Sequence, residues 1–235
     1  MQINGSISFL EWESEFFGSR IGRFTPGGDQ MLPVEVMQQY HLLQARVSAE
    51  DYESLGTLNR LGFRLAEGEA SLVMTLRQTA RQTGVRIARA GQIPALRQAA
   101  ASAFLQSRFR APWFNEDDCR RFYAQWIENA VNGTFDDQCL VACNAQGQPE
   151  GFVSVRETGE QARIGLLAVL PDARGKGVGQ RLLLAAADWG RVRGVTQLHI
   201  TTQLSNLTAM RLYLRSGARL ENTAYWLYRK TDDPL

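Results

Sequence analysis

The residues best placed for chemistry form a glycine turn, Arg174-Gly-Lys-Gly-Val-Gly-Gln180. The apolar residues 164–170 before it are typical of a strand, and the leucines and alanines of 180–193 recur at the spacing of a buried helix face. The first N–H groups of a helix have no partners within the helix, and the helix dipole adds positive potential there. Glycines let the backbone approach an anion at this point, and the Arg and Lys add charge. We therefore expect a phosphate group at this turn.

Two common phosphate-binding motifs do not fit the turn. A P-loop needs Ser or Thr after Gly-Lys, but Gly177 follows Lys176. A dinucleotide fingerprint needs glycine at the sixth position from Gly175, where Gln180 stands. A surface turn with solubilising charges is the alternative that the hexapeptide alone leaves open. The strand before it and the helix after it favour the ligand.

A second motif, Asn206-Leu-Thr-Ala-Met-Arg-Leu-Tyr-Leu-Arg-Ser-Gly217, follows the apolar run 197–202. Asn206 or Ser205 can cap a helix, and Gly217 can end it. Tyr213 lies about two turns after Asn206, so both are on one helix face. A lone tyrosine here would be an ordinary core residue. However, the two motifs, in this order and spacing, resemble motifs A and B of the GCN5-related N-acetyltransferase (GNAT) family.

The resemblance covers about residues 85–235 and implies an α/β fold with a mixed, mainly antiparallel central sheet flanked by helices. It implies that acetyl-CoA is the cosubstrate and that Tyr213 is the general acid that protonates the departing thiolate. Asn206 would orient the cofactor or a water. The residues expected to bind the cofactor are Leu167, Ala168, Val169, Arg174, Gly175, Lys176, Gly177, Val178, Gly179, Gln180 and Asn206.

A closer resemblance, to members of this family that act on nucleotide-linked amino sugars, extends over nearly the whole chain. It rests on residues 103–113, 121–130, 133–136 and 221–229. It implies acetyl transfer to the 4-amino group of dTDP-4-amino-4,6-dideoxy-D-galactose by a cytoplasmic homodimer. The alternatives are a GNAT enzyme that acts on another small-molecule or protein amine, or a non-catalytic CoA-binding module. The intact motif B argues against the second alternative.

The substrate side is less clearly marked in the sequence. The loop 106–114 carries two arginines and three aromatic rings, which is typical either of a packed surface loop or of a lip that contacts phosphates and a base. No carboxylate lies in 162–169 to serve as a base, although Glu157 and His199 are near in the chain, and the amine could instead bind in its neutral form. The candidates for substrate binding are Arg108, Arg110, Trp113 and Glu157.

The first 80 residues predict a smaller α/β N-terminal domain, separated from the acetyltransferase domain (85–235) by the polar stretch 75–84. Within it, residues 42–76 have the same strand–helix–glycine–strand order as 198–229. At a constant offset Gly62 falls at Gly217, and Asp51 falls at Asn206. The first unit is thus either a partial copy of the acetyltransferase fold or a chance likeness.

The composition excludes several classes of function. The 235 residues carry a formal net charge of +2, which gives no whole-chain case for nucleic acid or an anionic membrane. No apolar run approaches the roughly 20 residues of a spanning helix, and the start of the chain lacks a secretory signal, so we expect a cytoplasmic protein. Three cysteines and two histidines predict no metal site and free thiols in the core.

Overall fold

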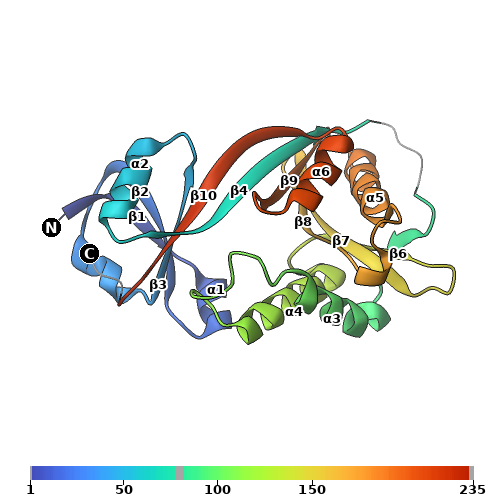
Figure 1. The fold of residues 1–235 in the computed structure, drawn as a ribbon, viewed down its shortest axis with the longest axis horizontal. Coiled ribbons are helices and arrows are strands. Elements are labelled where there is room, and N and C mark those ends of the chain that lie inside the picture. The colour runs from blue at the N-terminus through green and yellow to red at the C-terminus, as the bar shows by residue number, and fades with distance from the viewer. Residues whose placement is uncertain (1, 78–81, 233–235) are drawn as a thin grey trace.

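The computed structural model describes residues 2–77 and 82–232. Within these residues, ten strands form a single sheet in the order β1-β2-β3-β10-β4-β9-β8-β7-β6-β5 (Figure 1). Neighbouring strands are antiparallel except for the parallel pairs β2–β3 and β8–β9. The expected mixed, mainly antiparallel sheet flanked by helices is therefore confirmed. The strands are β1 Gln2–Phe9, β2 Ile21–Pro33, β3 Leu42–Ser48, β4 Arg64–Thr75, β5 Val85–Ile87, β6 Gln138–Cys143, β7 Pro149–Thr158, β8 Gln161–Val169, β9 Gln197–Gln203 and β10 Arg219–Lys230.

Helices cover both faces of the C-terminal half of the sheet. Helices α3 and α4 pack on one face around Leu96, Phe122 and Phe152, and α5 and α6 pack on the other around Leu182 and Ile200. A separate core lies under α2 in the N-terminal half. The helices are α1 Glu11–Phe17, α2 Tyr52–Arg60, α3 Ile93–Ala103, α4 Glu116–Asn132, α5 Val178–Val192 and α6 Leu207–Arg215, with short 3-10 turns at Val34–Gln39, Ala90–Gln92 and Pro171–Ala173.

The long strands β4 and β10 join the two halves of the molecule. They run side by side between the halves in Figure 1, and they pair antiparallel from Arg219↔Val73 to Tyr228↔Arg64. Strand β10 lies between β3 and β4, so the last strand of the chain is part of both halves of the sheet. The stretch 75–84, expected as a domain boundary, includes residues 78–81, which are outside the described residues.

The segment β3–α2–β4 corresponds to β9–α6–β10 at an offset of 155 residues, and the pairing of β4 with β10 is symmetric under this offset. Adding 155 to 64 gives 219, and adding 155 to 73 gives 228. The pair Arg219↔Val73 is thus the counterpart of Arg64↔Tyr228. The helix caps correspond as well: the Asp51 side chain accepts from the third residue after it, and the Asn206 side chain does the same. This register favours the proposal that the first unit is a partial copy of the C-terminal half.

The three cysteines are free and buried, which confirms the expectation of core thiols. Within residues 2–77 and 82–232, no cluster of three or more His, Cys, Asp or Glu side chains is arranged to hold a metal ion. In the same part of the chain, no helix is both long and apolar enough to cross a membrane.

Candidate active site

Strands β8 and β9 separate in the middle of the sheet. Their parallel pairing covers only 161–163 with 197–199, whereas β8 stays paired with β7 as far as Val169↔Gly151. Among the described residues, no strand pairs with the other edge of Leu167–Val169. An open strand edge presents unpaired N–H and C=O groups, which an extended amide-bearing ligand can bind in β-fashion.

A β-bulge lies in β8 at this opening. The register with β7 shifts between Val153↔Leu167 and Val155↔Ile164. The Leu166 N–H donates to Ser154 Oγ (2.9 Å), and that hydroxyl donates to Asp136 Oδ2 (2.5 Å). Asp136 is only 2% exposed and also accepts from an indole N–H. The buried carboxylate therefore holds the bulge that opens the strand edge.

Gly165 is required at the bulge, because an added Cβ would lie 2.2 Å from Asp136 Oδ2 and 2.7 Å from Ser154 Oγ. We expect Gly165→Ala to lower the free energy of unfolding by about 2–3 kcal/mol, the usual cost of overpacking, and to weaken acetyl-CoA binding. Chemical denaturation and titration calorimetry measure the two effects. The control is Gly56→Ala, where the new Cβ would meet only the end of an arginine at 3.6 Å. Equal stability of the two variants would contradict the assigned role of the glycine.

The glycine turn leads directly into α5. Gly175 and Gly177 both have φ of 74°, a left-handed conformation that favours glycine. Gly177 is the N-cap of α5 and no side chain caps the helix, so the first N–H groups are left for another acceptor. Arg174, Lys176 and Gln180 around the turn are exposed. The anion site expected from the sequence is therefore geometrically open, with unpaired donors and two cationic side chains beside it.

Tyr213 and Asn206 lie on α6. Tyr213 is 5% exposed, no described residue hydrogen-bonds its hydroxyl, and burial raises its pKa to about 12. The phenol therefore keeps its proton throughout the physiological pH range. Asn206 is the N-cap of α6, and its Oδ1 accepts from the Ala209 N–H at 3.1 Å. The amide oxygen is thus engaged by the helix, while the amide nitrogen can still donate to a ligand.

The cap predicts how Asn206 variants behave. Asn206→Ala removes the cap and should lower the free energy of unfolding by about 1 kcal/mol. Asn206→Asp keeps an acceptor for the Ala209 N–H, so its stability should stay near that of the parent protein, as thermal unfolding would show. If the aspartate variant is stable but weak in acetyl-CoA binding, the amide nitrogen contributes to the ligand. Equal stability of the alanine variant and the parent protein would exclude the capping role.

One cavity of about 2020 Å³ connects these features. Most of the expected cofactor residues line it (Leu167, Ala168, Val169, Arg174, Gly175, Gly177, Val178, Gly179, Gln180 and Asn206), and so does Tyr213. Its far end is lined by β1, α1, β2 and β3 of the N-terminal half and by β4 and β10, the strands that join the two halves. Ligand sites usually occupy about 300–1,000 Å³, so this cavity has room for two large ligands.

Comparison with known proteins decides the family. The model of the acetyltransferase (GNAT) family matches residues 93–218. The chain is also 45% identical over 232 residues to a dTDP-fucosamine acetyltransferase of Escherichia coli O6:H1, covering 97% of this chain and 100% of that protein. The chain belongs to the GNAT acetyltransferase family. The resemblance drawn from the two motifs is therefore confirmed, and with it an N-acetyltransferase that uses acetyl-CoA.

Solved structures share the fold of this acetyltransferase. A GCN5-related N-acetyltransferase from Sphaerobacter thermophilus superposes with a TM-score of 0.65 at 17% identity, over 98% of this chain and 77% of that one. The PaiA N-acetyltransferase from Thermoplasma acidophilum, solved in complex with coenzyme A, has a TM-score of 0.51 at 18% identity, over 62% of this chain and 97% of that one. The open strand edge and the uncapped turn described above fit the amides and the diphosphate of this cofactor.

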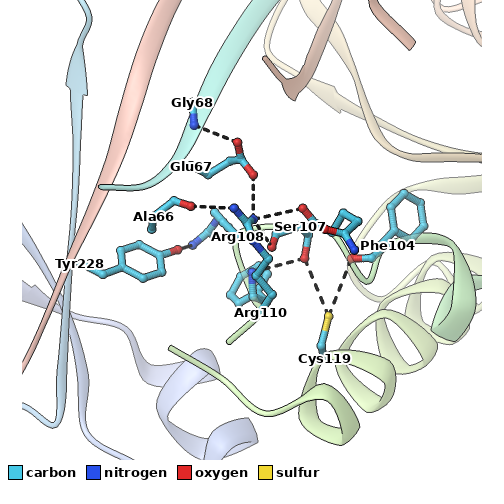
Figure 2. A network of polar contacts seen from close by, with 11 residues as sticks. Ala66, Glu67, Gly68, Phe104, Ser107, Arg108, Arg110, Cys119 and Tyr228 are labelled. Atoms are coloured by element: carbon cyan, nitrogen blue, oxygen red, sulfur yellow. Dashed lines mark hydrogen bonds and ion pairs between the residues drawn. The ribbon is translucent and has the colours of Figure 1, made fainter. Parts of the chain in front are cut away.

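The loop 106–114 is packed against the body of the acetyltransferase. Its three rings, Phe109, Trp113 and Phe114, are at most 9% exposed, so the packed-loop alternative holds for them. Arg110 donates to Glu67 at 2.7 Å and to the carbonyls of residues 66, 106 and 107, as Figure 2 shows. Arg110 therefore holds the loop to β4.

The other substrate candidates lie in different places. Arg108 lines the cavity, and its guanidinium donates to Gln44 at 2.9 Å and to the Tyr228 hydroxyl. Trp113 packs edge-on against Tyr228, away from the cavity lining. Glu157 is exposed near the end of β7 and is not part of the lining, whereas His199 is, with its Nδ1 3.8 Å from Glu221 Oε2. Of the four candidates, the structure thus brings only Arg108 to the cavity.

Sequence reasoning did not find Asp136, Arg23 or Trp226, all of which line the cavity. Asp136 lies between α4 and β6, far along the chain from the bulge that it supports. Arg23 comes from β2 and Trp226 from β10, and only the pairing of β10 with β3 brings these strands together. A short sequence motif carries no signal for such strand pairings.

Proposed function

We propose that the protein transfers acetyl from acetyl-CoA to the 4-amino group of dTDP-4-amino-4,6-dideoxy-D-galactose. The observation that carries this proposal is the 45% identity to the Escherichia coli dTDP-fucosamine acetyltransferase over the full length of that protein. The cavity supports it, because its lining joins the acetyltransferase half to the N-terminal half in one space large enough for a cofactor and a sugar nucleotide.

The chain's own groups suit direct transfer. Backbone groups of Leu167–Val169 and the turn 174–180 bind the donor, so that the sugar amine attacks the thioester carbon and the C–S bond breaks. Tyr213 then gives its proton to the departing sulfur. Its pKa of about 12 makes it a weak acid, but the same burial would raise the pKa of a thiol that departs beside it. Proton transfer from the phenol to the sulfur is therefore less unfavourable than a comparison with the pKa of a thiol in water indicates.

The amine enters as the neutral base in this proposal. Strand β8 offers no carboxylate over residues 162–169, and the buried Asp136 is engaged at the bulge. The proton that the amine loses after attack passes to water in the cavity. The rate should therefore rise with pH until the amine is mostly neutral, since only that form has a free electron pair.

The test is a product assay with the full-length protein, acetyl-CoA and a panel of amines. We expect dTDP-4-amino-4,6-dideoxy-D-galactose to gain the mass of one acetyl group together with stoichiometric release of CoA thiol. Free amino sugars, aminoglycosides and lysine peptides should react far more slowly. A different preferred amine would replace the proposed acceptor within the same family, and binding of acetyl-CoA without transfer to any amine would indicate a CoA-binding module.

We also propose that the protein is a cytoplasmic homodimer, as the sequence resemblance implies. Light scattering on the purified protein should give twice the chain mass at the concentrations used for the activity assay. A monomer with full activity would contradict the dimer without affecting the proposed reaction.

A further inference from the structure

Three arginines surround an indole ring at the far end of the cavity. Arg23, Arg46 and Arg108 line the cavity together with Trp226, and we call these four residues the Trp226 arginine cluster. The Trp226 ring has the Arg108 guanidinium 4.0 Å and the Arg23 guanidinium 5.2 Å from its centroid. Arg46 is the cross-strand neighbour of Trp226 in the β3–β10 pair, so their side chains lie on the same face of the sheet.

Arg23 is the member of the cluster whose charge is least compensated. Its Nε is buried without a hydrogen-bond partner, and no described residue forms an ion pair with its guanidinium. Burial lowers its pKa most and the positive charge of Arg108 lowers it further, while Glu13 and Tyr228 act in the opposite direction without reversing the shift. A buried cationic donor without an acceptor is costly unless a ligand supplies the acceptor.

The acidic residues at this end do not neutralise the cluster. Glu69 pairs with Arg46 at 2.7 Å, and Glu13 lies 3.7 Å from Arg108. Glu67 is taken by Arg110 at 2.7 Å, and Glu11 lines the cavity but is exposed. Among the described residues, only Glu69 and Glu13 thus lie within 4 Å of a guanidinium group of the cluster, and no carboxylate does so for Arg23. A diphosphate with two negative charges would offset the surplus charge and give Arg23 an acceptor.

We propose that the Trp226 arginine cluster binds the diphosphate of the sugar nucleotide, while the glycine turn at the start of α5 binds the diphosphate of CoA. This inference rests on the proposed function, because it takes the second ligand to be a nucleoside diphosphate sugar. The two anion sites belong to different halves of the molecule, which leaves the cavity between them for the sugar and the thioester.

The test compares dTDP with thymidine by titration calorimetry on the full-length protein. The parent protein should bind dTDP roughly tenfold to a hundredfold more tightly than thymidine, the usual worth of charged hydrogen bonds to phosphate. In Arg23→Gln this ratio should fall by about tenfold, with thymidine and acetyl-CoA affinities unchanged. Arg23→Lys, which keeps the charge but loses the planar fork, should give an intermediate ratio.

Matched variants complete the test. Arg174→Gln, at the glycine turn, should weaken acetyl-CoA binding and leave the dTDP-to-thymidine ratio unchanged. Arg60→Gln, at an exposed position on α2, should change neither. If Arg23→Gln fails to fold, as lost acetyl-CoA binding would reveal, Arg46→Gln should instead show the lower preference for dTDP over thymidine.

Three results would overturn the inference: no preference of the parent protein for dTDP, a full preference in folded Arg23→Gln, or loss of the preference in Arg174→Gln. The proposed function fails by a different result, the absence of acetyl transfer to the dTDP-linked amino sugar. If Arg23→Gln transfers acetyl to the dTDP-linked amino sugar with an unchanged KM for the sugar nucleotide, the cluster is not the diphosphate site. The proposed function would still stand.

Discussion

Replacing Tyr213 with phenylalanine should lower kcat about a hundredfold, the usual worth of one general acid, while the dissociation constant for acetyl-CoA changes little. The phenol is 5% exposed on α6, and no described residue hydrogen-bonds it, so the substitution removes a proton donor without breaking a contact in the protein. Phenylalanine keeps the ring that packs in the core. Steady-state kinetics with saturating sugar nucleotide, together with calorimetric titration of acetyl-CoA, measure the two effects separately.

The pH dependence of this effect has a defined sign. Burial raises the pKa of Tyr213 to about 12, so the acid is present at every pH below that value. The ratio of parent to Tyr213→Phe activity should therefore stay constant between about pH 6 and pH 10, where an unperturbed tyrosine would begin to ionise. Unchanged turnover of the phenylalanine variant would remove the acid role. A ratio that falls steeply above about pH 8 would contradict the raised pKa.

The sequence predicted best what depends on neighbouring residues. The strand, the glycine turn and the helix of 164–193 follow from local spacing, and α5 begins at Val178, two residues before the expected start. The cap at Asn206 and the position of Tyr213 on the same helix also follow from a single segment. Such features need no knowledge of distant residues, because the hydrogen bonds that define them close within one or two turns.

The rest of the site depends on strand pairing across the chain. Arg23 and Trp226 meet because β10 inserts between β3 and β4, and Asp136 reaches Gly165 because the bulge leaves room for its carboxylate. Composition and periodicity do not encode which strands become neighbours. For the same reason, the sequence alone does not decide whether the loop 106–114 is a packed loop or a lip that contacts the substrate. Its two arginines have different partners although only one residue separates them.

A substitution of Arg110 tests whether the loop 106–114 is held by packing or contacts the substrate, because the contacts of Arg110 are to the protein itself. Arg110→Met leaves the Glu67 carboxylate, 8% exposed, without its cation and removes the donors to three backbone carbonyls. Breaking a buried pair costs about 3–5 kcal/mol, and the partial exposure of the guanidinium favours the lower end, about 3 kcal/mol or roughly 10 °C in Tm. Calorimetric unfolding measures the loss. Because the loop also carries Arg108, the KM for the sugar nucleotide should rise while that for acetyl-CoA stays constant.

A second substitution separates a structural role from a substrate contact. Adding Glu67→Gln to Arg110→Met removes the uncompensated charge, so the double variant should recover part of the lost stability. Arg120→Met, which breaks an exposed ion pair with Glu116 on α4, is the matched control and should cost less than about 1 kcal/mol. If Arg110→Met keeps the parent stability yet loses sugar-nucleotide binding, Arg110 contacts the substrate directly. Lost stability that returns with the second substitution means that Arg110 serves the site by holding the loop, and with it Arg108, against β4.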